Sequence, residues 1–233
     1  MILLSQIKNG LLKEDGILIK IVARIYSVFG RNHCKVQRGN SVNKDGTFLR
    51  HCNIFVSGTG NKIVFDTKGK NHLVNCKIVI SGNNNIVSFG KFNSLYDCEI
   101  IIDDNGGSIS FGDNNKICGR THLAAIEGTS ITIGCDCLFS SNVTFRTGDS
   151  HSIISTETNK RINKSKSIVV GDRVWFGNNC TILKGVSLCD DTIVGTCSLV
   201  TKSPTLGNVV LAGIPACVVK NNVRWETERI AFD

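Results

Sequence analysis

Residues 170–200 read VGDRVWFGNNCTILKGVSLCDDTIVGTCSLV, and an apolar residue recurs there at every sixth position: Val170, Phe176, Ile182, Leu188, Val194 and Val200. No helix has a period of six, and an ordinary strand alternates with a period of two. A strict period of six indicates short strands that meet at regular corners, each sending one apolar side chain to a common axis. The stretch therefore predicts a prism-shaped β-helix.

The residues between these six positions agree with a narrow coil. Smaller side chains stand four residues after the apolar positions, at Val174, Cys180, Val186, Thr192 and Ser198. Glycines directly follow three of the apolar positions, at Gly171, Gly177 and Gly195. We expect corners at these glycines, where the backbone needs a residue that tolerates unusual angles.

A looser repeat precedes the strict one. Cys52, Cys76 and Cys98 each begin a similar segment, and a phenylalanine follows each cysteine thirteen residues later. These units of 24 and 22 residues indicate wider coils of the same solenoid. Their β-branched residues favour inward-facing rows; they are Ile54, Val56, Ile78, Ile80, Ile100 and Ile102. Runs of Gly and Asn supply the turns. Whether the stacked asparagines form side-chain ladders is left open by the sequence.

Composition narrows the class of protein. The chain has 233 residues, eleven cysteines and a formal charge of +8. We interpret the repeated cysteines as small buried side chains in a reducing cytoplasm. Cys135 and Cys137 are the one close pair, but no second pair or nearby histidine completes a metal site, so we expect no metal. The positive charge favours an anionic ligand. No motif supports nucleic-acid binding.

The N-terminal part reads differently. Residues 11–30 are the best candidate for a helix, and residues 1–45 are predicted to form a partly helical cap over the first coil. No apolar stretch reaches the ~18 residues that a transmembrane helix needs. No secretion signal is visible. A peripheral membrane contact is a weaker option for this segment.

Between Arg146 and Ser167 the six-residue register is lost, and a solenoid that interrupts its own core usually does so for a site. The insert contains His151, Asp149 and two serines beside the histidine. It is also strongly basic, through Lys160, Arg161, Lys164 and Lys166. These charges either clamp an acidic glycan or pyrophosphate, or merely solvate a loop.

The pattern aliphatic–Gly–x–x–small–x resembles the hexapeptide repeat of left-handed parallel β-helix acyltransferases. Within that family, Asp-Ser-His-Ser-Ile at 149–153, Lys-Arg-Ile-Asn at 160–163 and Val-Trp-Phe-Gly at 174–177 look like the polysaccharide O-acetyltransferase branch. Ala-Gly-Ile-Pro-Ala at 212–216 resembles the segment that closes the helix in the family. The left hand comes from this resemblance, because spacing alone does not give it.

The resemblance implies a mechanism. His151 would be the general base that takes a proton from a sugar hydroxyl, which then attacks the thioester of acetyl-CoA. Asp149 or a backbone carbonyl would orient the imidazole. Trp175 would contact the acetyl-thioester end of coenzyme A and help to position it, although an aromatic contact between protomers is the other interpretation.

Further positions match the family's coenzyme A contacts: Asn178, Thr196, Thr201, Lys202 and Lys220. Cys217 departs from the pattern, because relatives often have a basic residue there, and this puts one phosphate contact in doubt. Family members are usually trimers, so the resemblance implies a homotrimer with each site between neighbouring helices.

The sequence thus predicts an all-β, left-handed parallel β-helix with a loop insertion and a short N-terminal cap. The predicted segments are a cap (1–45), wider coils (46–146), an active-site loop (147–167), regular coils (168–216) and a C-terminal tail (217–233). The predicted activity is a cytoplasmic, acetyl-CoA-dependent O-acetyltransferase acting on a capsule, O-antigen or sialic acid sugar. Open alternatives are a sugar-nucleotide N-acetyltransferase, acyl transfer to a small molecule, a metal-dependent hydratase and a non-catalytic scaffold.

Overall fold

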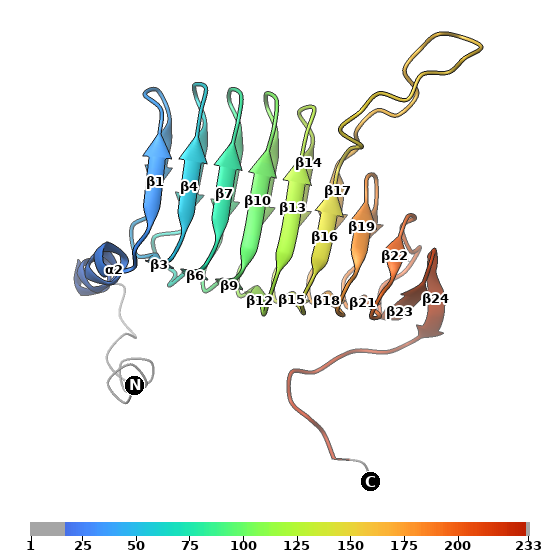
Figure 1. Ribbon diagram of the computed structural model, residues 1–233. Coiled ribbons are helices and arrows are strands. Elements are labelled where there is room, and N and C mark those ends of the chain that lie inside the picture. The colour runs from blue at the N-terminus through green and yellow to red at the C-terminus, as the bar shows by residue number, and fades with distance from the viewer. Residues whose placement is uncertain (1–16, 232–233) are drawn as a thin grey trace.

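The computed structural model describes residues 17–231, which form a parallel β-helix of eight coils with three faces (Figure 1). Sheet A contains β1 (His33–Val36), β4 (Asn53–Val56), β7 (Lys77–Ile80), β10 (Cys98–Ile102), β13 (Thr121–Ala125), β16 (Val143–Arg146), β19 (Thr181–Leu183) and β22 (Leu199–Val200). Sheet B contains β2 (Ser41–Asn43), β5 (Lys62–Phe65), β8 (Ile86–Phe89), β11 (Ser108–Phe111), β14 (Ser130–Ile133), β17 (Ile168–Val170) and β20 (Ser187–Leu188). Sheet C contains β3 (Phe48–Arg50), β6 (His72–Val74), β9 (Ser94–Tyr96), β12 (Lys116–Ile117), β15 (Leu138–Phe139), β18 (Trp175–Phe176), β21 (Ile193–Val194), β23 (Val209–Gly213) and β24 (Ala216–Asn221).

The winding of the coils is left-handed, as the family resemblance implied. In Figure 1 the strands of sheet A run upward on the near side, the chain returns on the far side, and successive coils advance to the right. Neighbouring strands pair in parallel throughout, except for the antiparallel pair β23–β24 at the C-terminal end. The predicted fold class is therefore confirmed.

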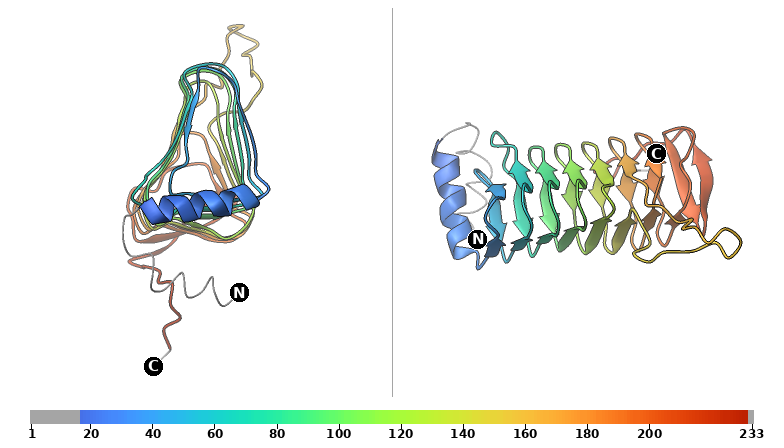
Figure 2. Two further views of the ribbon diagram at one scale, coloured as in Figure 1. Left: turned by 90° about the vertical axis from the view of Figure 1, so that its left-hand side faces the viewer. Right: turned by 90° about the horizontal axis from the view of Figure 1, so that it is seen from above.

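The coils have two sizes. From β1 to β18 the coils are long: Ile78 pairs with Ile100, 22 residues further on. From β19 to β23 they are short, and Ile182 pairs with Val200, 18 residues further on. From β4 onward, a strand of sheet A or B in a long coil has two inward side chains, such as Ile100 and Ile102, whereas in a short coil it has one, such as Ile182. The long coils therefore make a taller triangle in cross-section (Figure 2).

The predicted apolar row forms the core. All six of its side chains are at most 2 % exposed, and Ile133, Phe139 and Phe145 continue the row toward the N-terminus. In the long coils Phe65, Phe89 and Phe111 stack along the axis, with ring centroids 4.5 and 5.2 Å apart. Cys52, Cys76 and Cys98 are buried and free, as predicted.

Glycine occupies the positions after the apolar row for a different reason from the one predicted. Gly171, Gly177 and Gly195 do not have positive φ, which is found instead at corner residues such as Arg173 and Asn179. A Cβ on Gly171 would lie 2.3 Å from the Asp190 carboxylate in the next coil, and one on Gly177 would lie 2.7 Å from the backbone nitrogen of Thr196. Glycine is needed there because the next coil passes too close for a side chain.

The stacked asparagines form side-chain ladders, a point that the sequence left open. Asn61 and Asn85 stack at one corner, and Asn71, Asn93 and Asn115 stack at another. Within each ladder, the side-chain oxygen of one asparagine accepts a hydrogen bond of 2.9–3.0 Å from the backbone N–H of the next asparagine. All five are at most 1 % exposed, so these bonds satisfy polar groups that burial would otherwise penalise.

A helix and a hairpin cover the two ends. α2 (Ile17–Phe29) lies across the first coil, where Tyr26 packs edge-on against Phe48 at 5.6 Å (Figure 2). Ile21, Ile25, Val28 and Phe29 remain exposed on its outer side. Residues 11–16 of the predicted helix lie outside the described residues, and the peripheral membrane contact stays a prediction. β1 and β2 fall within the range assigned to the cap, and β24 extends into the range assigned to the tail.

No helix among residues 17–231 has the length and apolar character needed to cross a bilayer.

Candidate functional site

The insertion at residues 147–167, here called the arm, leaves the last long coil between β16 and β17 and projects beyond the shorter coils (Figure 1). Its base is closed by a hydrogen bond from the Lys166 amide to the Thr147 carbonyl, 2.9 Å long. Its two sides pair with each other through Ile154 and Arg161. The arm is thus a braced hairpin-like extension at the step where the helix becomes narrower.

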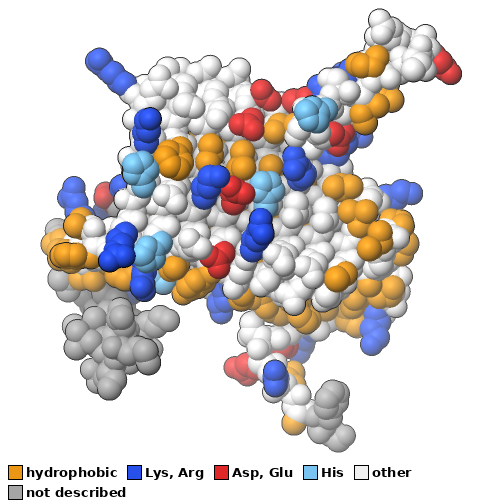
Figure 3. All heavy atoms as spheres, in the orientation of Figure 1, with side chains coloured by type: hydrophobic (Ala, Val, Ile, Leu, Met, Phe, Trp, Pro, Cys, Tyr) orange, Lys and Arg blue, Asp and Glu red, His pale blue; other side chains and the backbone are white. Residues whose placement is uncertain are grey.

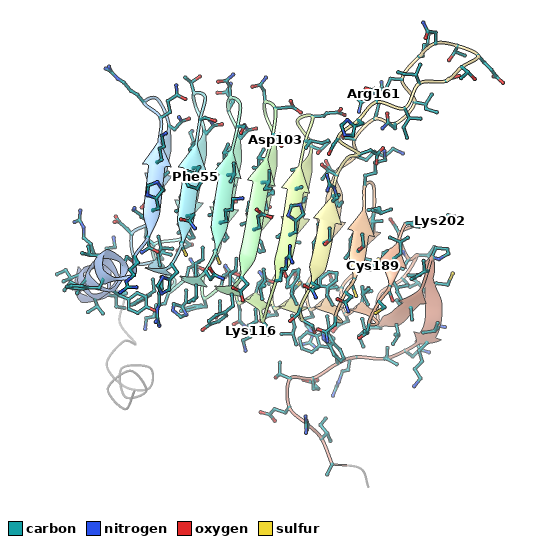
Figure 4. The ribbon with its side chains drawn as sticks, viewed as in Figure 1. Phe55, Asp103, Lys116, Arg161, Cys189 and Lys202 are labelled. Atoms are coloured by element: carbon teal, nitrogen blue, oxygen red, sulfur yellow. The ribbon has the colours of Figure 1, made fainter. Side chains whose placement is uncertain are left out.

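Two carboxylates anchor the arm to the coils. The Arg161 guanidinium lies 2.5 Å from the Glu127 carboxylate, which also accepts a hydrogen bond of 3.1 Å from the Ser165 amide. Arg161, and after it Ser165, hold the pKa of the Glu127 carboxyl below its ordinary value. Lys184, in the first short coil, forms an ion pair with Asp149. The contact with Lys184, followed by that with Asn163, lowers the pKa of the Asp149 carboxyl. Figure 4 shows Arg161 on the arm.

His151 stands near the base of the arm with an exposed side chain. Its backbone is fixed: the amide donates to the Asp149 carbonyl over 2.8 Å, and its carbonyl accepts from the Asn163 amide group over 2.7 Å. Its imidazole has no hydrogen-bond partner within residues 17–231. The chain therefore holds the backbone of His151 and leaves both ring nitrogens available.

Asn163 organises this turn. It is 7 % exposed, and its Nδ2 donates to the Asp149 carboxylate (2.8 Å) as well as to the His151 carbonyl. Its Oδ1 accepts from the Ile153 amide at 2.8 Å. One buried side chain thus ties the residues before and after His151.

Asp149 does not contact the imidazole of His151. Of the two orienting groups that the sequence left open, its carboxylate is occupied by Lys184 and Asn163. Asp149 instead helps to hold the backbone of the arm. Asn163 donates hydrogen bonds to both the Asp149 carboxylate and the His151 carbonyl.

Trp175 lies on β18, on the outer side of sheet C. Its ring faces that of Trp225, with centroids 6.2 Å apart. The C-terminal segment is held there by the Trp225 indole N–H, which donates to the Arg173 carbonyl over 2.6 Å. Sheet C and the arm are at opposite edges of the prism in Figure 1, so one chain does not bring Trp175 and His151 together.

The remaining predicted residues fall on separate corners. Asn178 and Thr196 occupy the corner between sheets C and A, where the Asn178 side-chain oxygen accepts from the Ser141 amide at 2.9 Å. Thr201 and Lys202 follow β22, on the side of the prism that carries the arm (Figure 4). Lys220 is exposed on β24. The structure gathers none of these five with His151 in one cavity.

Sequence reasoning missed Glu127, Lys184 and the role of Asn163. Asn163 stands in a quoted motif, which was a usable signal. Lys184 lies 35 residues from Asp149 and follows no repeat, so its contact could not be read from spacing.

The two cysteines of the close pair differ in burial: Cys135 is half-buried and Cys137 is buried. Cys137 is 1 % exposed, burial raises its pKa to about 12, and its thiol donates to the Gly171 carbonyl. Within residues 17–231 there is no group of three or more His, Cys, Asp or Glu side chains that could hold a metal ion.

Comparison with known proteins finds relatives that match part of this chain. No family model matches the chain. It is 35 % identical over 97 residues to a polysialic acid O-acetyltransferase of Escherichia coli O1:K1, covering 41 % of this chain and 31 % of the relative. It is 36 % identical over 107 residues to a putative lipopolysaccharide biosynthesis O-acetyl transferase of Escherichia coli K12, covering 42 % and 53 %. The matched part thus covers only 31 % and 53 % of the lengths of these two relatives.

The solved structure of the polysialic acid O-acetyltransferase OatWY is similar over most of both chains. It has a TM-score of 0.72 and 27 % identity, with 85 % of this chain and 89 % of that chain covered. The eight left-handed coils, the interrupting arm and these similarities agree. These findings support the resemblance to the hexapeptide-repeat acyltransferases and, within them, to the polysaccharide O-acetyltransferase branch.

Proposed function

We propose that this protein transfers an acetyl group from acetyl-CoA to a hydroxyl of a cell-surface polysaccharide sugar of the capsule, O-antigen or sialic acid type. The observation that carries the proposal is His151: an exposed imidazole on a backbone that Asn163 and Asp149 hold in place. The named activities of the relatives support the same reaction class.

In the proposed reaction, neutral His151 accepts the proton of the acceptor hydroxyl. The hydroxyl oxygen forms a bond to the acetyl carbonyl carbon, and the tetrahedral oxyanion is stabilised by hydrogen-bond donors. The carbon–sulfur bond then breaks, and the coenzyme A thiolate takes the proton from the imidazolium. An imidazole can both accept and return a proton, so the same group can serve both steps.

The separation of His151 from Trp175 favours a homotrimer. If each site lies in a groove between two helices, the arm of one protomer faces coenzyme A contacts of its neighbour. In this proposal Trp175, Asn178, Thr196, Thr201, Lys202 and Lys220 line the coenzyme A side of the groove. Light scattering should show a trimer, and a stable, active monomer would contradict the arrangement.

The cysteines support a cytoplasmic location for the proposed reaction. All eleven are free, and four of them are exposed. Free exposed thiols fit a reducing environment, so we place the reaction in the cytoplasm.

The test is thiol release from acetyl-CoA with a panel of capsule and O-antigen oligosaccharides. We expect His151→Ala to lower turnover by about 10²–10⁴-fold, because a general base is lost, while coenzyme A binding stays unchanged. His33→Ala, which removes an exposed histidine on β1, is the matched control.

Each other outcome has a clear meaning. Release that is unaffected by His151→Ala would remove this residue from the mechanism and favour an amine acceptor. A wild-type protein that neither releases thiol nor binds coenzyme A would be a non-catalytic scaffold.

A further inference from the structure

A shallow hollow of about 320 Å³ lies on the outer face of sheet A, beside the arm. It crosses β10, β13 and β16, and its lining includes Glu99, Arg120, His122 and Arg146. Figure 3 shows charged and histidine side chains gathered over the middle of this face. Nothing in the proposed reaction uses this hollow so far.

Two arginines of the hollow have no carboxylate partner in the described part of the chain. Arg120 and Arg146 are exposed and form no ion pair, unlike Arg161, Arg173 and Arg224. Arg146 makes one side-chain hydrogen bond, to the Ser150 hydroxyl at 2.9 Å. A guanidinium presents a planar fork that matches a carboxylate, so these two side chains offer sites for an acidic ligand.

The acidic residue of the hollow is already neutralised. Glu99 lies 2.8 Å from Lys77 and 2.9 Å from Nδ1 of His122. Lys77 and then His122 hold the pKa of the Glu99 carboxyl below its ordinary value, so it is ionised and compensated. The charge left for a ligand is therefore positive.

His122 adds a polar group of a different kind. Glu99 accepts the hydrogen bond from Nδ1, which leaves Nε2 to accept from a hydroxyl. This tautomer is fixed by the carboxylate and does not depend on the ligand. Carboxylate-binding arginines beside a hydroxyl-binding imidazole match a sugar that carries both groups.

The hollow leads to the arm. Arg120 directly precedes β13, and Arg146 pairs with Ala124 at its far end, so the two positions differ by about 13 Å along the strands. Arg146 binds Ser150, the residue before His151. A sugar chain lying along β13 would therefore arrive at the exposed imidazole.

We propose that this hollow is a binding subsite for a carboxylate-bearing sugar, which holds the acceptor glycan across sheet A. Its role in catalysis rests on the proposed function, but the binding itself does not. In this subsite Arg120 and Arg146 bind carboxylate groups of the glycan, and Nε2 of His122 accepts a hydrogen bond from a sugar hydroxyl.

The test measures binding of a sialic acid oligosaccharide without acetyl-CoA, by calorimetry at low and high salt. We expect Arg120→Gln and Arg146→Gln to weaken binding by about tenfold each, and raised salt to weaken wild-type binding. Arg50→Gln, an exposed arginine on sheet C, is the matched control and should bind as wild type does. A neutral galactose oligosaccharide should bind weakly and be unaffected by all three changes.

Three results would overturn the proposed subsite. They are wild-type affinity in a variant that carries both Arg120→Gln and Arg146→Gln, equal binding of the neutral oligosaccharide, or no binding of the sialic acid oligosaccharide. The two proposals fail separately. Acetyl transfer that needs His151 but ignores both arginines would remove the subsite alone. Arginine-dependent binding without any acetyl transfer would remove the enzymatic function alone.

Discussion

The long and short coils are built on one hydrogen-bonding plan but fill it differently. At the corner before sheet C, the long coils place Asn71, Asn93 and Asn115 inside, and later coils place Cys137, Val174 and Thr192 at the same position. The earlier long coils thus satisfy this corner with a buried amide ladder. The change to Cys137 and Val174 comes in the last two long coils, so the side chain at this corner changes before the length of the coil does.

The difference shows why the arm is where it is. The long coil from Ile78 to Ile100 has four more residues than the short coil from Ile182 to Val200, and the triangle loses height after β18. The apex of the last long coil has no coil stacked beyond it, and the arm emerges there. Lys184, in the first short coil, then holds the arm through Asp149. The candidate site is a product of the change in repeat length.

The largest expected effect breaks the core at this step. Phe176→Ala should destabilise the protein by about 3–5 kcal/mol, because it removes a fully buried ring that contacts Phe139 at 4.7 Å and Phe145 at 5.2 Å. Solenoid coils contact only their neighbours, so hydrogen exchange should rise near β15–β21 and stay slow in β4–β8. Chemical unfolding gives the energy. A uniform rise along the whole chain would mean that the two coil types form one cooperative unit.

The next effect tests the asparagine ladder. Asn93→Ala should cost about 1–3 kcal/mol, because the Asn115 amide and the Gly112 carbonyl lose buried partners. Asn53→Ala, on the exposed side of β4, should change stability by less than about 0.5 kcal/mol. Urea unfolding of both variants checks this. Equal free energies of unfolding for the two variants would show that the ladder does not stabilise the long coils.

A smaller effect separates the arm from the coils. Asn163→Ala should lower turnover about tenfold and leave coenzyme A binding unchanged, since the backbone around His151 loses two hydrogen bonds and the Asp149 carboxylate loses one. Limited tryptic cleavage at Lys160 or Arg161 should become faster. Thr158→Ala, at the tip of the arm, is the control. Normal turnover with faster cleavage would show that a braced arm is not needed for the reaction.

Much of the fold was predictable because its signal is local. The six-residue row marks one inward position on each face of the short coils, and the cysteine and phenylalanine repeats mark the long coils. The reason for the glycines was not predictable, since close approach of the next coil is visible only when the coils are stacked. The strands β1 and β2 were missed because their coil carries neither repeat.

The candidate site was predictable only in part. The break in the register located the arm, and the family resemblance selected His151 within it. The partners of Asp149 were not predictable, because Lys184 and Asn163 reach it from segments without a fixed spacing. A carboxylate two residues from a histidine suggests an orienting group, but here a nearby ammonium and a buried amide bind it first.

The smallest expected effect concerns pH and the anchors of the arm. The pKa values of Asp149 and Glu127 are lowered in the folded chain, mainly by Lys184 and Arg161 respectively. A carboxyl whose pKa is lowered by folding contributes fully above its ordinary value of about 4, and that contribution is lost as the pH falls through the folded value. Exposed ion pairs contribute little, so overall stability should hardly change. Hydrogen exchange at the Ser165 and Ile153 amides should therefore show constant protection from pH 8 to about 5 and a loss below about 4. In Glu127→Gln the Ser165 amide should already exchange faster at neutral pH. Loss of protection between pH 7 and about 5.5 would point to a histidine and remove the carboxylates as the groups that hold the arm on the step.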